Sequence, residues 1–258
     1  MKKVFSLLAG LALSLAVLGT AHAGPRLDRI VEEQVIRVGT PGDYRPFAIK
    51  LDDGVYEGHD IVLIAAMADE LGWEIEYVPT SWPNLLDDLQ ADKFDIAVGG
   101  ITRNAARLGQ VDMLPGYAPF GKVALVRKSE ADQYKTLQDL NQPSVHVIKN
   151  PGGTNEEFVL EHLTNAKVST HEQNAEIPGL VAAGEGDVMI TETFEALHYA
   201  NEDDRLAALF IDNPLTPQHE LGFMIPTDDA DYTRVMQFAW DLLQTRGVIQ
   251  EAANDWLK

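Results

Sequence analysis

Short apolar runs alternate with amphipathic segments along most of the chain. Runs such as residues 96–98 and 123–126 are continuously apolar, which is typical of strands buried on both faces of a sheet. Helical spacing appears between such runs, for example over residues 61–71, and stops there at Gly72. This alternation predicts an α/β architecture in which most strands are parallel.

The same pattern locates the expected elements along the chain. Strands are expected at residues 35–38, 74–78, 96–98, 122–127, 144–148, 166–170, 187–191 and 221–225. Helices are expected at residues 27–34, 61–71, 81–92, 155–163, 176–183 and 194–200, with an amphipathic segment over 232–258. Ser81 and Asp60 are expected helix caps, and Asn104 is expected to cap a short helix that carries Arg107.

Two interruptions of this alternation indicate two lobes. Residues 111–119 are irregular and contain prolines and a glycine, and residues 213–217 have the composition of a second crossing. Lobe 1 is therefore expected to contain residues 24–120 with residues 214–258 returning to it, and lobe 2 residues 121–213. Two lobes joined by two crossings predict a hinged ligand cleft between them.

The first 23 residues have the pattern of a cleaved signal peptide. Lys2 and Lys3 precede an apolar run over residues 4–18, and residues 21–23 (Ala-His-Ala) form a small-residue cleavage site, with cleavage expected after Ala23. The run is short for a membrane span, and the chain has no cysteine for a lipid anchor or a disulfide. We expect export to a bacterial periplasm, with no stable membrane anchor after cleavage.

The charge of the chain limits its partners. Its formal net charge is −20, and loss of Lys2 and Lys3 with the signal would make it more negative. Such an acidic protein is not expected to bind nucleic acid or an anionic membrane. A small anion would have to be bound by a few well-placed donors, so individual basic residues are informative.

One strand-to-helix turn combines a hydroxyl with a guanidinium. Gly99 and Gly100 permit close approach of a ligand, and Thr102 and Arg107 follow them. The planar guanidinium of arginine matches a carboxylate in a bidentate manner, and open α/β sheets bind ligands at the carboxyl ends of their strands. These residues predict a carboxylate site, although a surface arginine beside a loop would have the same pattern.

A glycine-rich turn at residues 150–155 (Asn-Pro-Gly-Gly-Thr-Asn) lies between a strand and a helix. Free amides at a helix N-terminus bind anions, so Asn150, Thr154 and Asn155 are candidates for an anion site. An ordinary tight turn with Thr154 as the helix cap is the alternative.

Aromatic and acidic candidates occupy two further turns. Trp82 and Asn84, like Tyr44, are either ligand contacts or part of the core. Glu192 and Glu195 end a strand and enter the first turn of the next helix, where acidic residues are also common for reasons of the helix dipole.

Other chemistries lack sequence support. There is no phosphate-loop lysine, dinucleotide fingerprint or nucleophile elbow. The histidines after residue 23 show no paired metal-ligand spacing, so no metal site is expected.

Taken together, these residues resemble the type II periplasmic solute-binding proteins that serve amino-acid importers. The resemblance extends over essentially the whole chain after residue 23. It implies two lobes, each with a mostly parallel sheet flanked by helices. In that family, the threonine and arginine that correspond to Thr102 and Arg107 hold a ligand carboxylate, and a carboxylate at the position of Glu192 holds an α-ammonium group.

The closer resemblance is to an enzymatic branch of that superfamily, the periplasmic cyclohexadienyl dehydratases. Residues 79–85 (Pro-Thr-Ser-Trp-Pro-Asn-Leu) and 150–156 look like signatures of that branch, as do residues 42–44 and 26–30. Glu195 also fits, since the dehydratases have a glutamate there that acts as general acid, whereas transport proteins typically have an apolar residue.

This resemblance implies the reaction and the roles at the site. Water and carbon dioxide would be lost together from prephenate, giving phenylpyruvate, or from arogenate, giving phenylalanine, without a cofactor. Glu195 would be the general acid, held protonated by desolvation or by a neighbouring carboxylate such as Glu192. The other implied substrate contacts are Thr102, Arg107 and Thr154 for carboxylates, Trp82 for the ring, Asn84, Asn150 and Asn155 for polar groups, Lys122 near a carboxylate, and Tyr44.

The chain departs from the family at Arg103, where an aliphatic residue is usual, and at residues 113–117 in the hinge. A second cation in the cleft would be expected to strengthen binding of a dianion or to change the preferred substrate. The alternative function is a non-catalytic amino-acid-binding protein of an ABC importer, with a permease as partner. The sequence leaves open prephenate versus arogenate and any self-association into homo-oligomers.

Overall fold

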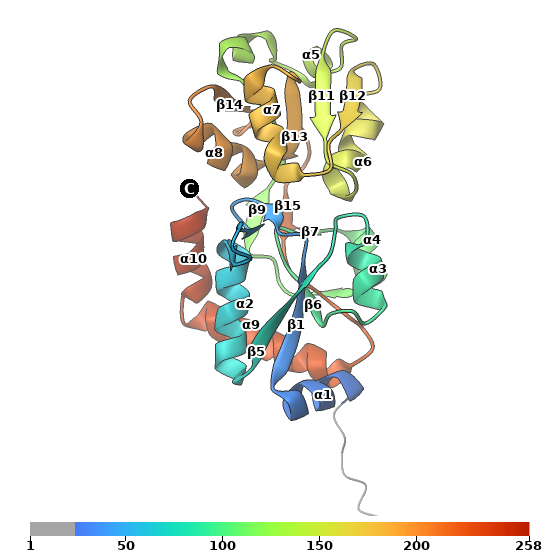
Figure 1. Cartoon of the computed structure of the whole chain (residues 1–258), viewed down its shortest axis with the longest axis vertical. Coiled ribbons are helices and arrows are strands. Elements are labelled where there is room, and N and C mark those ends of the chain that lie inside the picture. The colour runs from blue at the N-terminus through green and yellow to red at the C-terminus, as the bar shows by residue number, and fades with distance from the viewer. Residues whose placement is uncertain (1–23, 258) are drawn as a thin grey trace, which may run out of the picture.

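The computed structural model describes residues 24–257, so the expected signal peptide at residues 1–23 lies outside the described part. Figure 1 shows two lobes stacked along the long axis of the molecule, with α1 at the far end of one lobe and α10 close to where the lobes meet. Within residues 24–257, no helix is both long enough and apolar enough to cross a membrane.

The sheet of lobe 1 has the strand order β5-β1-β6-β16-β8. Strand β1 (Val35–Thr40) pairs in parallel with β5 (Glu74–Pro79) and β6 (Ile96–Ala97). Strand β16 (Met224–Ile225) is antiparallel to both β6 and β8 (Asp112–Met113). One strand, β16, is thus reversed within an otherwise parallel sheet.

The sheet of lobe 2 repeats this plan in the order β12-β11-β13-β10-β14. Strand β11 (His146–Lys149) pairs in parallel with β12 (Lys167–Thr170) and β13 (Val188–Glu192). Strand β10 (Lys122–Arg127) is antiparallel to β13 and to β14 (Leu206–Leu209). The two-lobed α/β fold with mostly parallel sheets, inferred from the sequence, is confirmed.

Helices cover both sheets (Figure 1). Those of lobe 1 are α1 (Pro25–Glu33), α2 (His59–Leu71), α3 (Leu85–Gln90), α4 (Ala105–Leu108), α9 (Ala230–Thr245) and α10 (Val248–Trp256). Those of lobe 2 are α5 (Leu137–Leu140), α6 (Gly153–His162), α7 (Ile177–Ala183) and α8 (Thr193–Glu202), with 3-10 turns η1 (Lys128–Gln133) and η2 (Asn174–Glu176).

Apolar side chains on each sheet pack to both faces. Along β10, Ala124 and Val126 belong to one buried cluster, and Val123 and Leu125 belong to another. Because successive side chains of a strand point to opposite faces, a strand covered on both sides has to be apolar at every position. This explains the continuous apolar runs of the sequence.

Two small antiparallel sheets lie near the contact between the lobes. One has the order β7-β15-β9, from Thr102–Arg103, His219–Leu221 and Ala118–Phe120, and pairs the chain segments on either side of the two crossings. The other has the order β2-β3-β4, from Asp43–Tyr44, Ala48–Lys50 and Tyr56–Glu57.

A buried carboxylate ties α1 to the sheet of lobe 1. Asp95 is fully buried, and its oxygens accept hydrogen bonds from the guanidinium groups of Arg26 at 2.8 Å, Arg29 at 2.5 Å and Arg37 at 2.9 Å. Asp92 also accepts from Arg26 and Arg37 but is largely exposed. We call Asp95 and its three arginines the Asp95 cluster.

Several expected elements differ from the structure. The expected strand at 221–225 is split between β15 and β16 in two different sheets, and the segment 232–258 is broken into α9 and α10 at Gly247, which has a φ of 78°. The helix expected from Ser81 begins only at Leu85, and Asp60 lies inside α2 rather than at its cap. Strand β14 was not expected.

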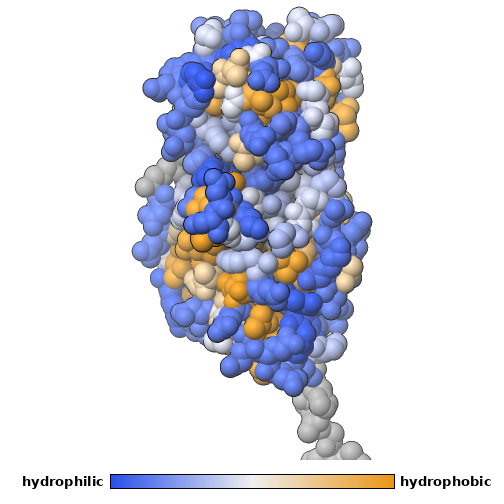
Figure 2. All heavy atoms as spheres, in the orientation of Figure 1, coloured by the Kyte–Doolittle hydropathy of each residue, from blue (hydrophilic) through white to orange (hydrophobic). Residues whose placement is uncertain are grey.

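The surface agrees with the charge of the chain. Figure 2 shows that hydrophilic residues cover most of the visible face, with apolar residues in small separate areas. This is the surface expected of a strongly acidic protein whose apolar side chains are used in its cores.

Candidate active site

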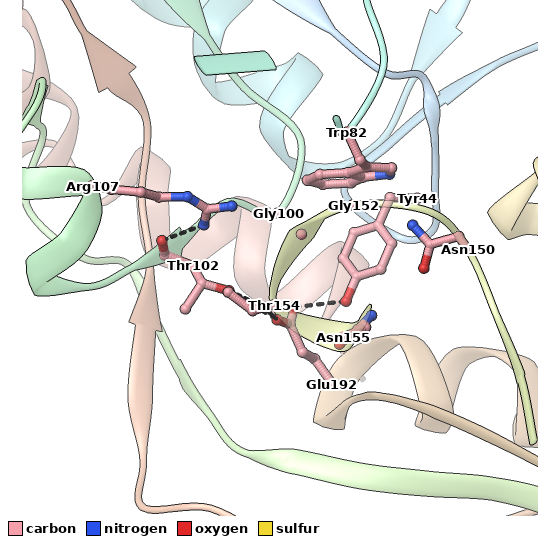
Figure 3. A pocket seen from close by; sticks show the side chains of 11 residues that line it. Tyr44, Trp82, Gly100, Thr102, Arg107, Asn150, Gly152, Thr154, Asn155 and Glu192 are labelled. Atoms are coloured by element: carbon pink, nitrogen blue, oxygen red, sulfur yellow. Dashed lines mark hydrogen bonds between the residues drawn. The ribbon is translucent and has the colours of Figure 1, made fainter. Parts of the chain in front are cut away.

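A small cavity lies where the two lobes meet (Figure 3). Its volume is about 20 Å³, which is room for about one water molecule. Lobe 1 lines it with Tyr44, Trp82, Gly100, Thr102 and Arg107, and lobe 2 with Asn150, Gly152, Gly153, Thr154, Asn155 and Glu192. The structure therefore brings most of the candidate residues together, from turns far apart in the sequence.

Arg107 is oriented by the turn that carries it. The Asn104 side chain caps α4 by accepting from the Arg107 main-chain amide at 2.9 Å, as expected from the sequence. Arg107 Nη1 donates to the Thr102 main-chain oxygen at 2.6 Å, which leaves other guanidinium donors for a ligand. Burial lowers the pKa of Arg107, but an arginine remains charged at neutral pH.

The side chain of Asp60 holds the loop before Thr102 through hydrogen bonds. Its Oδ2 accepts the main-chain amides of Gly99 at 2.9 Å and Gly100 at 2.8 Å. A Cβ on Gly100 would lie 2.6 Å from a ring carbon of Tyr44, so glycine is required at this cavity wall.

Glu192 is the centre of the hydrogen bonds in the cleft. It accepts from Tyr44 Oη at 2.6 Å, Thr102 Oγ1 at 2.9 Å and Lys122 Nζ at 2.9 Å. Tyr44 and Thr102 belong to lobe 1, so these bonds join the two lobes. Glu192 and Lys122 are both almost completely buried, which makes them an ion pair shielded from water.

Lys122 connects this ion pair to the start of α6. Its Nζ also donates to Thr154 Oγ1 at 2.8 Å and Asn155 Oδ1 at 2.5 Å. Burial lowers the pKa of Lys122, and the charge of Glu192 opposes that shift. Lys122 does not line the cavity itself but holds three residues that do.

The glycine-rich turn brings the start of α6 to the cavity wall, where Gly153 and Thr154 line it. No side chain caps this helix, and the Gly152 amide donates to Glu156 Oε2 at 2.7 Å. The alternative in which Thr154 caps the helix is wrong, because its hydroxyl contacts Thr102 and Lys122 instead. The arrangement suits a bound carboxylate, with Arg107 on the opposite side of the cavity.

Aromatic rings form another wall. Tyr44 stacks on Phe47 with ring centroids 5.6 Å apart and meets Trp82 edge-on at 5.5 Å. The Trp82 indole nitrogen donates to Asp43 Oδ1 at 2.8 Å, which fixes the ring at the cavity. Tyr44 is buried and Trp82 is only partly so, so the two contribute to the core and to the cavity at once.

Glu195 is fully buried one turn along α8 from Glu192. Asn174 Nδ2 donates to its Oε1 at 2.6 Å, and the Thr191 hydroxyl lies against its Oε2. Burial raises the pKa of Glu195 well above its usual range, the Thr191 and Asn174 hydrogen bonds oppose this, and the charges of Glu192 and Asp43 add to it. The carboxyl therefore stays protonated at a pH where an ordinary glutamate is ionised.

Glu195 itself does not line the cavity and lies one turn behind Glu192, which does. Two further sequence expectations do not fit the cleft. Asn84 is exposed at the start of α3 and does not line the cavity. Arg103 was expected to add a second cation, but its Nη1 pairs with Glu220 Oε2 at 2.5 Å across β7 and β15. The reason is that neighbouring residues of a strand point to opposite sides, so Arg103 faces away when Thr102 faces the cleft.

The sequence did not indicate several residues that shape the site. Asp60 was read only as a helix cap, while Asn174 and Thr191 were not considered as contacts of Glu195. Thr191 lies in the segment that ends with Glu195, so the four-residue spacing was a usable signal. Asn174 begins the short 3-10 turn η2, where the sequence has no periodic pattern, and had no such signal.

The paired sheets, the two crossings and the polar cleft between the lobes define a protein with the type II, two-lobed periplasmic-binding-protein fold. The chain belongs to the bacterial extracellular solute-binding proteins, family 3, whose family model matches residues 36–258. The family inferred from the sequence is therefore confirmed.

Individual relatives include an enzyme and binding proteins. The chain is 34% identical over 261 residues to the cyclohexadienyl dehydratase of Pseudomonas aeruginosa, covering 100% of this chain and 97% of that protein. It is 25% identical over 232 residues to the L-cystine-binding protein TcyJ of Escherichia coli, covering 89% and 85%.

Solved structures give the same two groups. An ancestral amino acid-binding protein, described as a precursor of cyclohexadienyl dehydratase, aligns with a TM-score of 0.83 at 35% identity, covering 90% of this chain and 100% of that one. An ancestral cyclohexadienyl dehydratase is 46% identical, with a TM-score of 0.56 and coverage of 92% and 98%.

Proposed function

We propose that this protein is a periplasmic cyclohexadienyl dehydratase that converts prephenate to phenylpyruvate, arogenate to phenylalanine, or both. The observation that carries the proposal is the buried carboxyl of Glu195, which burial keeps protonated one helical turn from Glu192 in the cavity wall. Expulsion of a hydroxyl group needs an acid of this kind, whereas reversible binding of an amino acid does not. The similarity to a dehydratase along the whole chain supports the same reading.

The chemistry follows from the residues of the cleft. Glu195 gives its proton to the ring hydroxyl, which leaves as water, while the ring carboxylate leaves as carbon dioxide. The electrons of the broken carbon–carbon bond complete the aromatic ring, and Glu195 is afterwards reprotonated from solvent. General acid catalysis of this kind contributes roughly 10²–10⁴-fold in typical enzymes.

The other residues bind and orient the substrate in this proposal. Arg107, Thr102 and Thr154, with the amides at the start of α6, hold a carboxylate. The lining by Trp82 and Tyr44 suits an apolar ring, and Asn150 and Asn155 orient polar groups. Lys122 neutralises Glu192, so an anionic substrate can enter a cleft that contains a carboxylate. The signal-peptide pattern at residues 1–23 supports a periplasmic location.

A non-catalytic amino-acid-binding protein of an ABC importer is the second candidate. Glu192 favours it, because a buried carboxylate in the cleft is suited to an α-ammonium group. Relatives named as binding proteins for L-cystine and arginine support the same class.

Incubation of residues 24–258 with prephenate tests the proposal. We expect rapid formation of phenylpyruvate, followed by its absorbance in alkali, with arogenate and phenylalanine assayed in parallel. If neither substrate is consumed and calorimetry detects tight binding of an amino acid, the importer reading replaces the enzyme reading.

Closure of the cleft depends on a glycine at position 152. A Cβ there would lie 2.7 Å from the Pro83 main-chain nitrogen on the opposite lobe. We expect Gly152→Ala to raise KM for prephenate roughly tenfold, within the about 1–3 kcal/mol cost of an overpacked contact.

Gly153→Ala is the matched control for that variant. Gly153 has a φ of 73°, close to the 76° of Gly152, but its Cβ would meet nothing nearer than Trp82 at 3.8 Å. Both variants share the backbone penalty, and only Gly152→Ala obstructs closure. Equal values of KM in the two variants would show that the contact with Pro83 is not needed for binding.

A further inference from the structure

Asn174 makes an unusual connection across the cleft. It lies in η2 of lobe 2 and is fully buried. Its Nδ2 donates to Glu195 Oε1 at 2.6 Å and to the main-chain oxygen of Asp43, in lobe 1, at 3.3 Å. One amide group therefore links the carboxyl of Glu195 to the main chain of the other lobe.

The orientation of this amide is fixed by its neighbours. Both contacts are oxygen acceptors, so the NH₂ end must face them. Asn174 Oδ1 is buried and has no hydrogen-bond partner among the described residues. The side chain is thus held through its donors alone, and loss of one acceptor removes half of what orients it.

Asp43 and Asn174 also meet through a second pair of groups. Burial raises the pKa of the Asp43 carboxyl, and hydrogen bonds from the Trp82 indole and the Asn174 main-chain amide oppose that shift. The contact between the lobes therefore uses both main-chain and side-chain groups of each residue.

We expect this contact to break and form again as the lobes move. A cavity with room for about one water molecule cannot admit a substrate, so the lobes must separate before a ligand enters. Separation removes Asp43 from Asn174, whereas Glu195, in the same lobe as Asn174, keeps its neighbour.

We propose that Asn174 is a positioning residue that couples closure of the cleft to the orientation of Glu195. In the closed cleft its NH₂ group is fixed between two acceptors and holds Oε1, while the Thr191 hydroxyl donates to Oε2. In the open cleft the amide keeps its bond to Glu195 but loses the acceptor on lobe 1. This inference rests on the proposed function, because it gives Glu195 the role of acid.

Several titratable groups surround Glu195, and each must be considered when its titration is measured. The charged or ionisable side chains that interact with it are Asp43, Tyr44, Lys122, Glu192 and Tyr199. Of these, Asp43 is the one that also contacts Asn174 from the other lobe.

Two variants should move the titration of Glu195 in opposite directions. Asn174→Ala removes a hydrogen bond that favours the ionised carboxylate, so the pKa of Glu195 should rise. Asp43→Asn removes a nearby negative charge and keeps an oxygen for Trp82 and the main-chain acceptor for Asn174, so the pKa should fall. We also expect Asn174→Ala to lower kcat roughly tenfold or more with little change in KM.

The titration of Glu195 is measured by ¹³C NMR on the protein of residues 24–258, labelled at the glutamate carboxyl carbon. The signal that is missing in Glu195→Gln is assigned to Glu195. Asn201→Ala, which changes an exposed asparagine of α8, is the matched control and should leave the titration unchanged. Opposite shifts in the two variants support the inference. An unchanged titration in both, or shifts in the same direction, would overturn it.

The NMR readout also separates this inference from the proposed function. If the wild type converts neither prephenate nor arogenate, the dehydratase proposal fails, but the titration still decides whether Asn174 and Asp43 act on Glu195. If Asn174→Ala does not fold, Asn174→Leu replaces it, because leucine has about the same size and lacks the NH₂ group that donates to Glu195 Oε1; an unmoved titration in that variant would overturn the inference.

Discussion

Replacement of Glu195 by glutamine is expected to lower kcat by roughly 10²–10⁴-fold, the usual contribution of a general acid. The amide has the size of the carboxyl and still accepts from Asn174, but it cannot release a proton to the leaving hydroxyl. Stability should change little, since glutamine keeps the size of the side chain and its acceptor for Asn174. Steady-state kinetics with prephenate, together with circular dichroism, would check this.

Glu202→Gln is the control for that experiment, because Glu202 is exposed near the end of the same helix. It should retain full activity.

The pH profile of kcat provides a further check. The pKa of Glu195 is raised, so the acid is protonated below that pKa, and kcat should fall as pH rises through it. A Glu195→Gln variant with wild-type kcat would remove Glu195 from the proposed role.

The second large effect is expected at Asp95. Asp95→Asn should lower the free energy of unfolding by about 3–5 kcal/mol, because the buried guanidinium of Arg26 loses the buried one of its carboxylate partners and keeps the exposed Asp92 and Asp228. The corresponding fall in Tm is roughly 6–20 °C, measured by thermal unfolding of residues 24–258.

Asp92→Asn is its matched control, since Asp92 pairs with the same Arg26 and Arg37 but is 61% exposed. Its loss should cost about 1 kcal/mol or less. A similar loss of the free energy of unfolding in both variants would show that burial of the carboxylate does not determine its contribution to stability.

The Asp95 cluster also predicts a dependence of stability on pH. Burial raises the pKa of Asp95, but hydrogen bonds from Arg37 and Arg29 outweigh it and leave the pKa lowered. Because the pKa of Asp95 is lowered in the folded state, its contribution to stability is complete above the pKa of the unfolded state, which is about 3.9. That contribution is lost as pH falls through the folded value, and the difference in stability between wild type and Asp95→Asn should shrink accordingly.

The sequence predicted the parts of the fold that depend on local patterns. Continuous apolar runs marked β6 and β10, and Gly72 ended α2 as expected. The segment 221–225 was misread because its apolar pattern does not record that Gly222 packs closely against Arg103 and that the chain changes sheets there. Strand β14 was missed because two alanines in four residues give a weak strand signal.

The candidate site was predictable where its residues stand at strand-to-helix turns. Thr102, Arg107, Thr154 and Glu192 meet because such turns gather at one edge of each sheet. The contact from Asn174 to Asp43 spans 131 positions and joins η2 of lobe 2 to β2 of lobe 1, so no local pattern could reveal it. Arg103 was misplaced because the direction of a side chain depends on the register of β7 with β15.

The hydrogen bonds of Glu192 have a consequence for the release of products. Tyr44 and Thr102 donate to Glu192 from the opposite lobe, so the cleft can close upon its own side chains. Any ligand competes with these internal bonds for the same donors, and its observed affinity is reduced by the free energy of that self-closure. The closed, empty cleft therefore competes with the binding of a ligand. Product inhibition should therefore be weak, which benefits a catalyst and would be a disadvantage for a protein that must retain its cargo.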